Sequence, residues 1–174
     1  MKITLKNIKH SAFASQETHC FEAVIYIDGK RFCHVQNDGH GGSDDYYALN
    51  ESTMSEMWDQ INEINAELGK EKLTTEYGEG KSFTVSNSLE IVVGDLMNDH
   101  LTNKQAKRIY NKAMKSGVSY VEDSAIYQIK CDVNHEESMI QIFNRLHAKN
   151  GSVEIINLMN PEKAIERYKE LVLV

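Results

Sequence analysis

The sequence has few cysteines and no long apolar run, and both absences limit what the protein can be. Three cysteines, Cys20, Cys33 and Cys131, form no CxxC pair, which argues against a disulfide framework and favours a reducing, cytoplasmic compartment. The most apolar run, residues 89–97, is interrupted by two acidic residues and is far shorter than the ~20 residues that cross a bilayer. We therefore expect a soluble cytoplasmic protein without a membrane partner.

The sequence also lacks an excess of positive charge. Its 26 acidic residues outnumber its 19 basic residues, which gives a formal net charge of −7. An acidic protein repels nucleic acid unless its basic residues are segregated on one face, so nucleic acid is disfavoured as a partner. The charge is too modest for a mimic of a phosphate backbone. Hydrophobic residues make up 41% of the chain, which is ordinary globular usage, and the length fits one domain.

A β-hairpin is the clearest local element of the sequence. Alternating apolar residues predict strands over 3–8 and within 19–37, and Asp28-Gly29 is a dipeptide that two-residue hairpin turns prefer. The turn alone predicts the register of the two strands. It pairs Ile27 with Lys30, Ile25 with Phe32, Ala23 with His34, and Cys20 with Asn37.

Spacing and turn residues predict the remaining elements. Helical periodicity, capping residues and a proline at a first helical position predict helices over 53–69, 86–100, 102–116, 139–150 and 160–171. Apolar, β-branched runs predict strands over 118–122, 125–131 and 153–158. Residues 37–47 are predicted to form an ordered loop, and residues 70–82 a long loop or a weak hairpin.

This order of elements predicts an α+β fold. Hairpins and consecutive helices do not alternate as βαβαβ, which disfavours a doubly wound parallel sheet. We expect an antiparallel or mixed β-sheet built from hairpins, with helices packed on one face. A single domain over 1–174 would contain a β-hairpin region (1–47), a helical region (52–116) and a C-terminal ββαβα region (117–174).

Two polar segments are expected to converge at the open end of the predicted hairpin. If pairing persists beyond the strands, residues 15–19 lie beside residues 37–45, with His19 opposite Asp38. The candidate binding residues in these segments are Glu17, Thr18, His19, Asn37, Asp38, His40, Asp44 and Asp45.

The same residues allow a structural and a chemical interpretation. Asn, Asp, Ser and Thr in tight loops usually bond to nearby backbone groups, and we prefer this structural interpretation. It requires no cofactor. The alternative is a metal-dependent hydrolase of a phosphodiester or nucleotide, with imidazole and carboxylate ligands for a divalent ion. Its candidate ligands are Glu17, His19, Asp38 and His40, with Asp44 or Asp45 as base. The phosphate-binding pattern GxxxxGK[ST] is absent, which weakens a nucleotide ligand without a metal.

Basic residues gather on the third predicted helix. Five of the nineteen lie there, and four of these share one helical stripe. The residues are Lys104, Lys107, Arg108, Lys112 and Lys115. A solvated helix face is the preferred interpretation, and a partner or nucleic-acid surface is the alternative. No aromatic residues are interleaved with the stripe, so stacking on a single strand is not indicated.

The N-terminal block resembles an uncharacterised family of small proteins encoded by bacteriophages and prophages. The features that carry the resemblance are FAS-x-ET-x-CF at 13–21, the turn Asp28-Gly29-Lys30 and NDGHGG at 37–42. The resemblance covers about the first 47 residues, with a looser similarity around 126–130, and it implies no established activity.

What the resemblance implies is a context in a bacterial host. Small cytoplasmic phage proteins often bind and disable a host protein, or remove or sequester a defence signal. We therefore expect a phage-encoded accessory protein that acts by binding, with a host protein as its partner. A hydrolase and a nucleic-acid-binding protein are the alternatives, and catalysis is less favoured than binding. No sequence feature indicates an oligomeric state.

Overall fold

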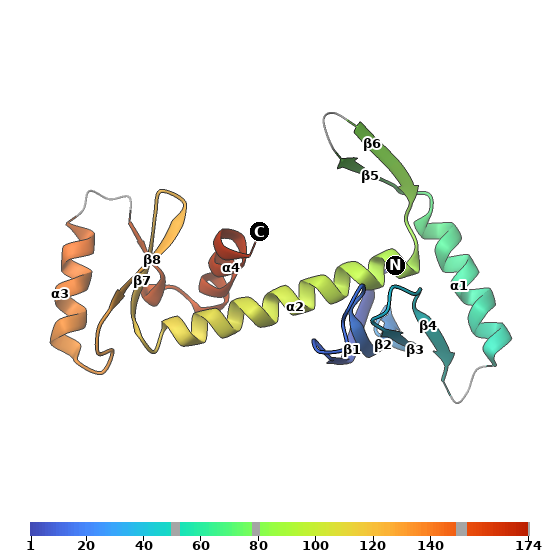
Figure 1. Ribbon diagram of the computed structural model, residues 1–174, viewed down its shortest axis with the longest axis horizontal. Helices are drawn as coiled ribbons and strands as arrows, with labels where there is room; N and C mark the ends of the chain where they lie inside the picture. The colour runs from blue at the N-terminus through green and yellow to red at the C-terminus, as the bar shows by residue number, and fades with distance from the viewer. Residues whose placement is uncertain (50–52, 78–80, 149–152, 174) are drawn as a thin grey trace. The chain divides into compact units, whose positions relative to one another are not determined.

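The computed structural model describes residues 1–49, 53–77, 81–148 and 153–173. Its internal contacts divide into two compact units, Met1–Met97 and Asn98–Val174. The division falls inside helix α2 (Leu89–Ala113) and not at a polar linker. Figure 1 traces the elements of both units along the chain. The expected single domain stays a prediction.

A four-stranded antiparallel sheet forms the first unit, with its strands in the order β1-β2-β3-β4. The strands are β1 (Ile3–His10), β2 (Cys20–Ile27), β3 (Lys30–Asp38) and β4 (Asp45–Ala48). The predicted turn is present, and Asp28 and Gly29 both have the positive φ that its tight geometry requires (48° and 83°). Strand β4 lies inside the segment predicted to be a loop, where Tyr46 is buried and aligns with Val35.

The predicted register of β2 and β3 is correct at the turn and wrong beyond it. Ile27 pairs with Lys30 as expected, but a β-bulge between Ile25 and Tyr26 shifts the remaining pairs by one residue. Ile25 therefore pairs with Cys33, Ala23 with Val35, and Cys20 with Asp38. The bulge has a packing reason, since it turns the fully buried side chains of Cys33 and Val35 towards the core.

Helix α1 (Met54–Leu68) follows the sheet and confirms the predicted capping box. The Thr53 hydroxyl accepts from the Glu56 amide, and the Glu56 carboxylate accepts from the Thr53 amide. Met57, Ile61 and Ile64 recur at helical spacing and are buried. The segment predicted to be a loop or weak hairpin is a hairpin of β5 (Lys72–Tyr77) and β6 (Lys81–Ser86).

Helix α2 replaces the two helices predicted over 86–100 and 102–116. Thr102 lies inside a continuous helix of 25 residues and caps nothing. The sequence contains no glycine or proline between Gly94 and Gly117, so nothing stops the helix after His100. A residue type that can cap a helix does not end one by itself.

The second unit contains a three-stranded antiparallel sheet in the order β8-β7-β9. Its strands and helices are β7 (Gly117–Glu122), β8 (Ala125–Lys130), α3 (Glu136–His147), β9 (Glu154–Ile155) and α4 (Pro161–Val172). The predicted hairpin is confirmed, with positive φ at Asp123 and Ser124 in its turn. The predicted helix starting at Pro161 is confirmed, while the predicted end of α3 at Asn150-Gly151 lies outside the described residues.

Half of the strand predicted over 153–158 is a 3₁₀ turn. Pairing with β7 covers only Glu154 and Ile155, and residues Ile156–Leu158 form the turn. The Asn157 side chain supplies the missing bonds to β7. Its Oδ1 accepts from the Ser119 amide at 2.7 Å and its Nδ2 donates to the Gly117 carbonyl at 3.1 Å.

These elements confirm the predicted α+β fold, with antiparallel sheets built from hairpins and helices packed against strands. In the second unit, one face of α2 packs into a core with β7 and α4. The buried members of that core are Ala106, Ala113, Val121, Ile156, Ala164 and Tyr168. Within the part of the chain that the structure describes, no helix is long and apolar enough to cross a bilayer.

Candidate functional site

The two polar segments of the first unit come together at the end of the sheet. The Gly39 carbonyl accepts from the amides of Gln16, Glu17 and Thr18 at 2.9, 3.0 and 3.4 Å. One carbonyl of the second segment thus holds three consecutive residues of the first. These bonds pair backbone groups of the two segments and hold the segments together.

The Asn37 side chain is the centre of this contact and is only 7% exposed. Its Oδ1 accepts from Thr18 Oγ1 at 2.7 Å and from the Gly39 amide at 2.9 Å. Its Nδ2 donates to the Gly42 carbonyl and to Asp44 Oδ1, both at 3.0 Å. Four bonds fill the usual capacity of an asparagine side chain. Asn37 therefore acts here as a structural residue, and none of its polar groups is left for a ligand.

Two glycines allow this close approach. Gly39 and Gly41 have φ of 87° and 89°, a region that other residues rarely adopt. A Cβ at Gly39 would lie 2.3 Å from the Ala14 carbonyl oxygen, and a Cβ at Gly41 would lie 2.2 Å from Glu17 Oε2. Both positions thus favour glycine for conformation, and Gly39 also requires it for space, because the Ala14 backbone cannot move aside as the Glu17 side chain can.

The carboxylates of the second segment differ in their environment. The His40 amide donates to Asp38 Oδ1 at 3.0 Å, and this bond, together with the nearby His40 ring, lowers the pKa of Asp38. Asp44 is partly buried, and burial raises its pKa despite the bond from Asn37. Asp45 begins β4 and is exposed.

The predicted metal ligands do not form a metal site. Across the described residues, no group of three or more His, Cys, Asp and Glu side chains could hold a metal ion. The expected position of His19 opposite Asp38 is wrong, because β2 begins at Cys20 and Cys20 takes that place. The His19 ring instead packs edge-on against His10, with 5.5 Å between ring centroids.

The loop over residues 11–19 contains features that the sequence did not reveal. The Ser15 hydroxyl accepts from the Cys20 amide at 2.9 Å, donates to the Ser11 carbonyl at 2.8 Å, and lies 3.2 Å from His10 Nε2. The Ser11 amide donates to the Cys20 carbonyl at 2.9 Å. These bonds close the loop at its base. At its tip, the Phe13 side chain is 99% exposed.

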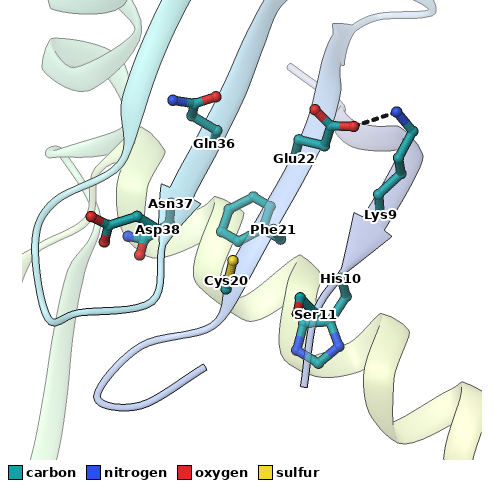
Figure 2. A pocket seen from close by; sticks show the side chains of 9 residues that line it. All are labelled: Lys9, His10, Ser11, Cys20, Phe21, Glu22, Gln36, Asn37 and Asp38. Carbon is teal, nitrogen blue, oxygen red and sulfur yellow. Dashed lines mark hydrogen bonds and ion pairs between the residues drawn. The ribbon is translucent and has the colours of Figure 1, made fainter. Parts of the chain in front are cut away.

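A pocket of about 410 Å³ lies beside the base of this loop. Figure 2 shows its nine lining side chains, with Lys9 and Glu22 joined by an ion pair across neighbouring strands. The lining residues are Lys9, His10, Ser11, Cys20, Phe21, Glu22, Gln36, Asn37 and Asp38. Only Asn37 and Asp38 were expected. Lys9 and His10 were missed because β1 was predicted to end at residue 8, whereas it continues to His10 beside Phe21.

The five basic residues of the predicted stripe lie in the second unit. Lys104, Lys107, Arg108 and Lys112 belong to α2, and Lys115 follows its last turn. All five side chains are exposed.

Comparison of the chain with protein-family models, with curated proteins and with solved structures finds no match. The resemblance to phage-encoded proteins thus has no support from these comparisons and stays an expectation.

Proposed function

We propose that the first unit is a binding module that engages a partner protein through the loop over residues 11–19, with Phe13 as the anchor. The observation that carries the proposal is the phenyl ring at the tip of this loop, which is 99% exposed. Burying such a ring contributes roughly 1.5–3 kcal/mol, and this gain is unused in the protein alone.

The rigidity of the loop supports the proposal. Bonds between Ser11, Ser15 and Cys20 close its base, and the Gly39 carbonyl holds residues 16–18. A loop that is ordered before binding loses little conformational freedom when it binds. The converged polar residues thus have a role in this proposal, since their bonds fix the loop that carries Phe13.

The surroundings of Phe13 define the partner that would fit. Aromatic anchors that dominate interface energies insert into well-packed apolar pockets and are surrounded by polar contacts. The partner therefore needs an apolar cavity for one phenyl ring. Around it we expect groups that bond with the exposed Glu17 and Asp38. The resemblance to phage-encoded proteins supplies the class of partner, a protein of the bacterial host.

The test compares two phenylalanine substitutions. The immobilised protein and its Phe13→Ala and Phe83→Ala variants would each be exposed to a bacterial host extract, and a retained protein would be purified and titrated calorimetrically. Phe83 is also exposed, at 48%, but lies on β6, outside the proposed surface. We expect Phe13→Ala to weaken binding by about 2 kcal/mol, which is roughly 30-fold. Phe83→Ala should leave the affinity unchanged.

Two results would contradict the proposal. One is a retained partner whose affinity is the same for Phe13→Ala and the unsubstituted protein. The other is the absence of any stoichiometric partner in host extracts. Because the ring is almost wholly exposed, its removal should not change the free energy of unfolding, so a loss of binding cannot be attributed to unfolding.

A further inference from the structure

We infer that the second unit carries a separate binding surface, a face of α2 that fits the phosphate backbone of a double-stranded nucleic acid. This basic face consists of Lys104, Lys107, Arg108, Asn111, Lys112 and Lys115. It is independent of the proposed protein-binding loop, which belongs to the first unit.

Packing fixes the orientation of the basic face. Ala106 and Ala113 lie in the core of the second unit, with Ile109, Tyr110 and Met114 packed partly against it. At 100° per residue, the five members of the basic face that belong to α2 occupy the opposite side of the helix, and Lys115 lies two residues beyond its end. All six residues are exposed. The helix cannot turn this face inward without exposing its buried alanines.

Among the described residues, no acidic side chain forms an ion pair with a cation of the basic face. The sequence contains no Asp or Glu between Asp99 and Glu122. Asp99 is itself bound by Lys169. The face therefore presents a local excess of positive charge, which attracts phosphate groups.

The net charge of −7 disfavours nucleic-acid binding less than its size indicates, because most of the negative charge lies in the first unit. Residues 1–97 carry 16 of the 26 acidic residues and 8 of the 19 basic ones. The second unit is left with 11 basic and 10 acidic residues. Exposed charges farther apart than about 8 Å are largely screened at physiological salt, so the local charge decides the interaction. The basic residues are segregated on one face, which is the condition under which an acidic protein can bind nucleic acid.

The chemistry of the basic face fits phosphates better than a protein. Every side chain on it is a hydrogen-bond donor, and none is aromatic or apolar. Protein interfaces are depleted of lysine and depend on buried aromatic anchors, which this face lacks. Binding to a single strand would need aromatic residues for stacking. Lys104 and Lys112 are about 12 Å apart along the helix, a length over which a duplex carries about seven phosphates.

The test is a salt titration of duplex binding. A fluorescent DNA duplex of mixed sequence would be titrated with the full chain, and anisotropy would report the Kd between about 50 and 200 mM salt. If four cations each neutralise one phosphate, Kd should rise roughly 100-fold over this range. Binding should not depend on the sequence of the duplex, because backbone contacts carry no sequence information.

Two sets of charge reversals distinguish binding through the basic face from a general effect of the protein's net charge. Lys104→Glu, Arg108→Glu and Lys112→Glu together should abolish binding at about 50 mM salt. The same reversal at the exposed Lys130, Arg145 and Lys163 changes the net charge equally and should retain most of the affinity. Lys104→Ala, Arg108→Ala and Lys112→Ala form a milder set, which keeps a good helix former and should flatten the salt slope by about one unit per lost contact.

Three results would overturn the inference. They are no duplex binding at the lowest salt, a Kd that does not depend on salt, and equal losses in the two reversal sets. Binding of the basic face to an acidic protein and not to the duplex would also overturn it. Failure here would leave the proposed role of Phe13 intact, because Phe13→Ala should not change duplex affinity.

Discussion

The two units use their polar residues in opposite ways. In the first unit, Thr18, Asn37 and Asp44 bond to one another and to loop backbone, so a cluster that looks chemically active holds the loops together. In the second unit, the cations of the basic face resemble an ordinary solvated stripe. Within the described residues, however, none of them forms an ion pair. Residue type alone therefore does not indicate a site, whereas the bonds already made by each side chain do.

Loss of a glycine should produce the largest effect on the first unit. Gly39→Ala would place a Cβ 2.3 Å from the Ala14 carbonyl oxygen and impose a left-handed φ on a residue with a side chain. We expect the free energy of unfolding to fall by about 2 kcal/mol or more, measured by urea denaturation. Gly42→Ala is the matched control, because a Cβ there meets nothing within 4 Å, and it should change stability by less than about 0.5 kcal/mol. Equal effects of the two substitutions would show that the loops are not packed as described.

A smaller effect should come from the partly buried carboxylate of Asp44. Burial raises the pKa of Asp44 in the folded state, so the folded state binds a proton more tightly than the unfolded state. Its ionised form therefore costs stability at neutral pH, and this cost disappears as the pH falls towards the usual aspartate range. Asp44→Asn keeps an oxygen that can accept from Asn37, so we expect it to stabilise the protein at pH 7.

The pH dependence checks this expectation. In urea denaturation, the gain from Asp44→Asn should shrink between pH 7 and about pH 4. Asp45→Asn removes the same charge from an exposed neighbour and serves as the control. A gain that stays constant with pH, or a loss of stability at pH 7, would mean that the Asp44 carboxylate is stabilised where it lies.

The fold class could be predicted because turns, caps and hydrophobic periodicity, which involve residues close in sequence, define most of the helices and strands. The capping box at Thr53 and the two tight turns define elements through bonds between near neighbours in sequence, and the structure contains all three. The bulge between Ile25 and Tyr26 could not be predicted in the same way. The bulge allows the side chains of Cys33 and Val35 to be buried. This burial depends on contacts with residues distant in sequence, which local patterns do not indicate.

The candidate site was predicted in part for the same reason. The convergence of residues 15–19 with residues 37–42 follows from antiparallel pairing, which survives a shift of one residue. The shift changes which residues pair with one another, so Asp38 pairs with Cys20 and not with His19 as expected. The importance of Phe13 depends on its 99% exposure. Nothing in the alternation of its neighbours predicts that exposure.

The central claim is that hydrogen bonds between the polar loops of the first unit stabilise the fold. A double-mutant cycle of Thr18→Val and Asn37→Ala tests it most directly, because the Thr18 hydroxyl donates to Asn37 Oδ1 at 2.7 Å. Urea denaturation of both single variants and of the double variant gives the coupling energy. We expect each single substitution to be destabilising and the two to be coupled by about 1 kcal/mol. Strict additivity, or no loss of stability on Asn37→Ala, would contradict the account.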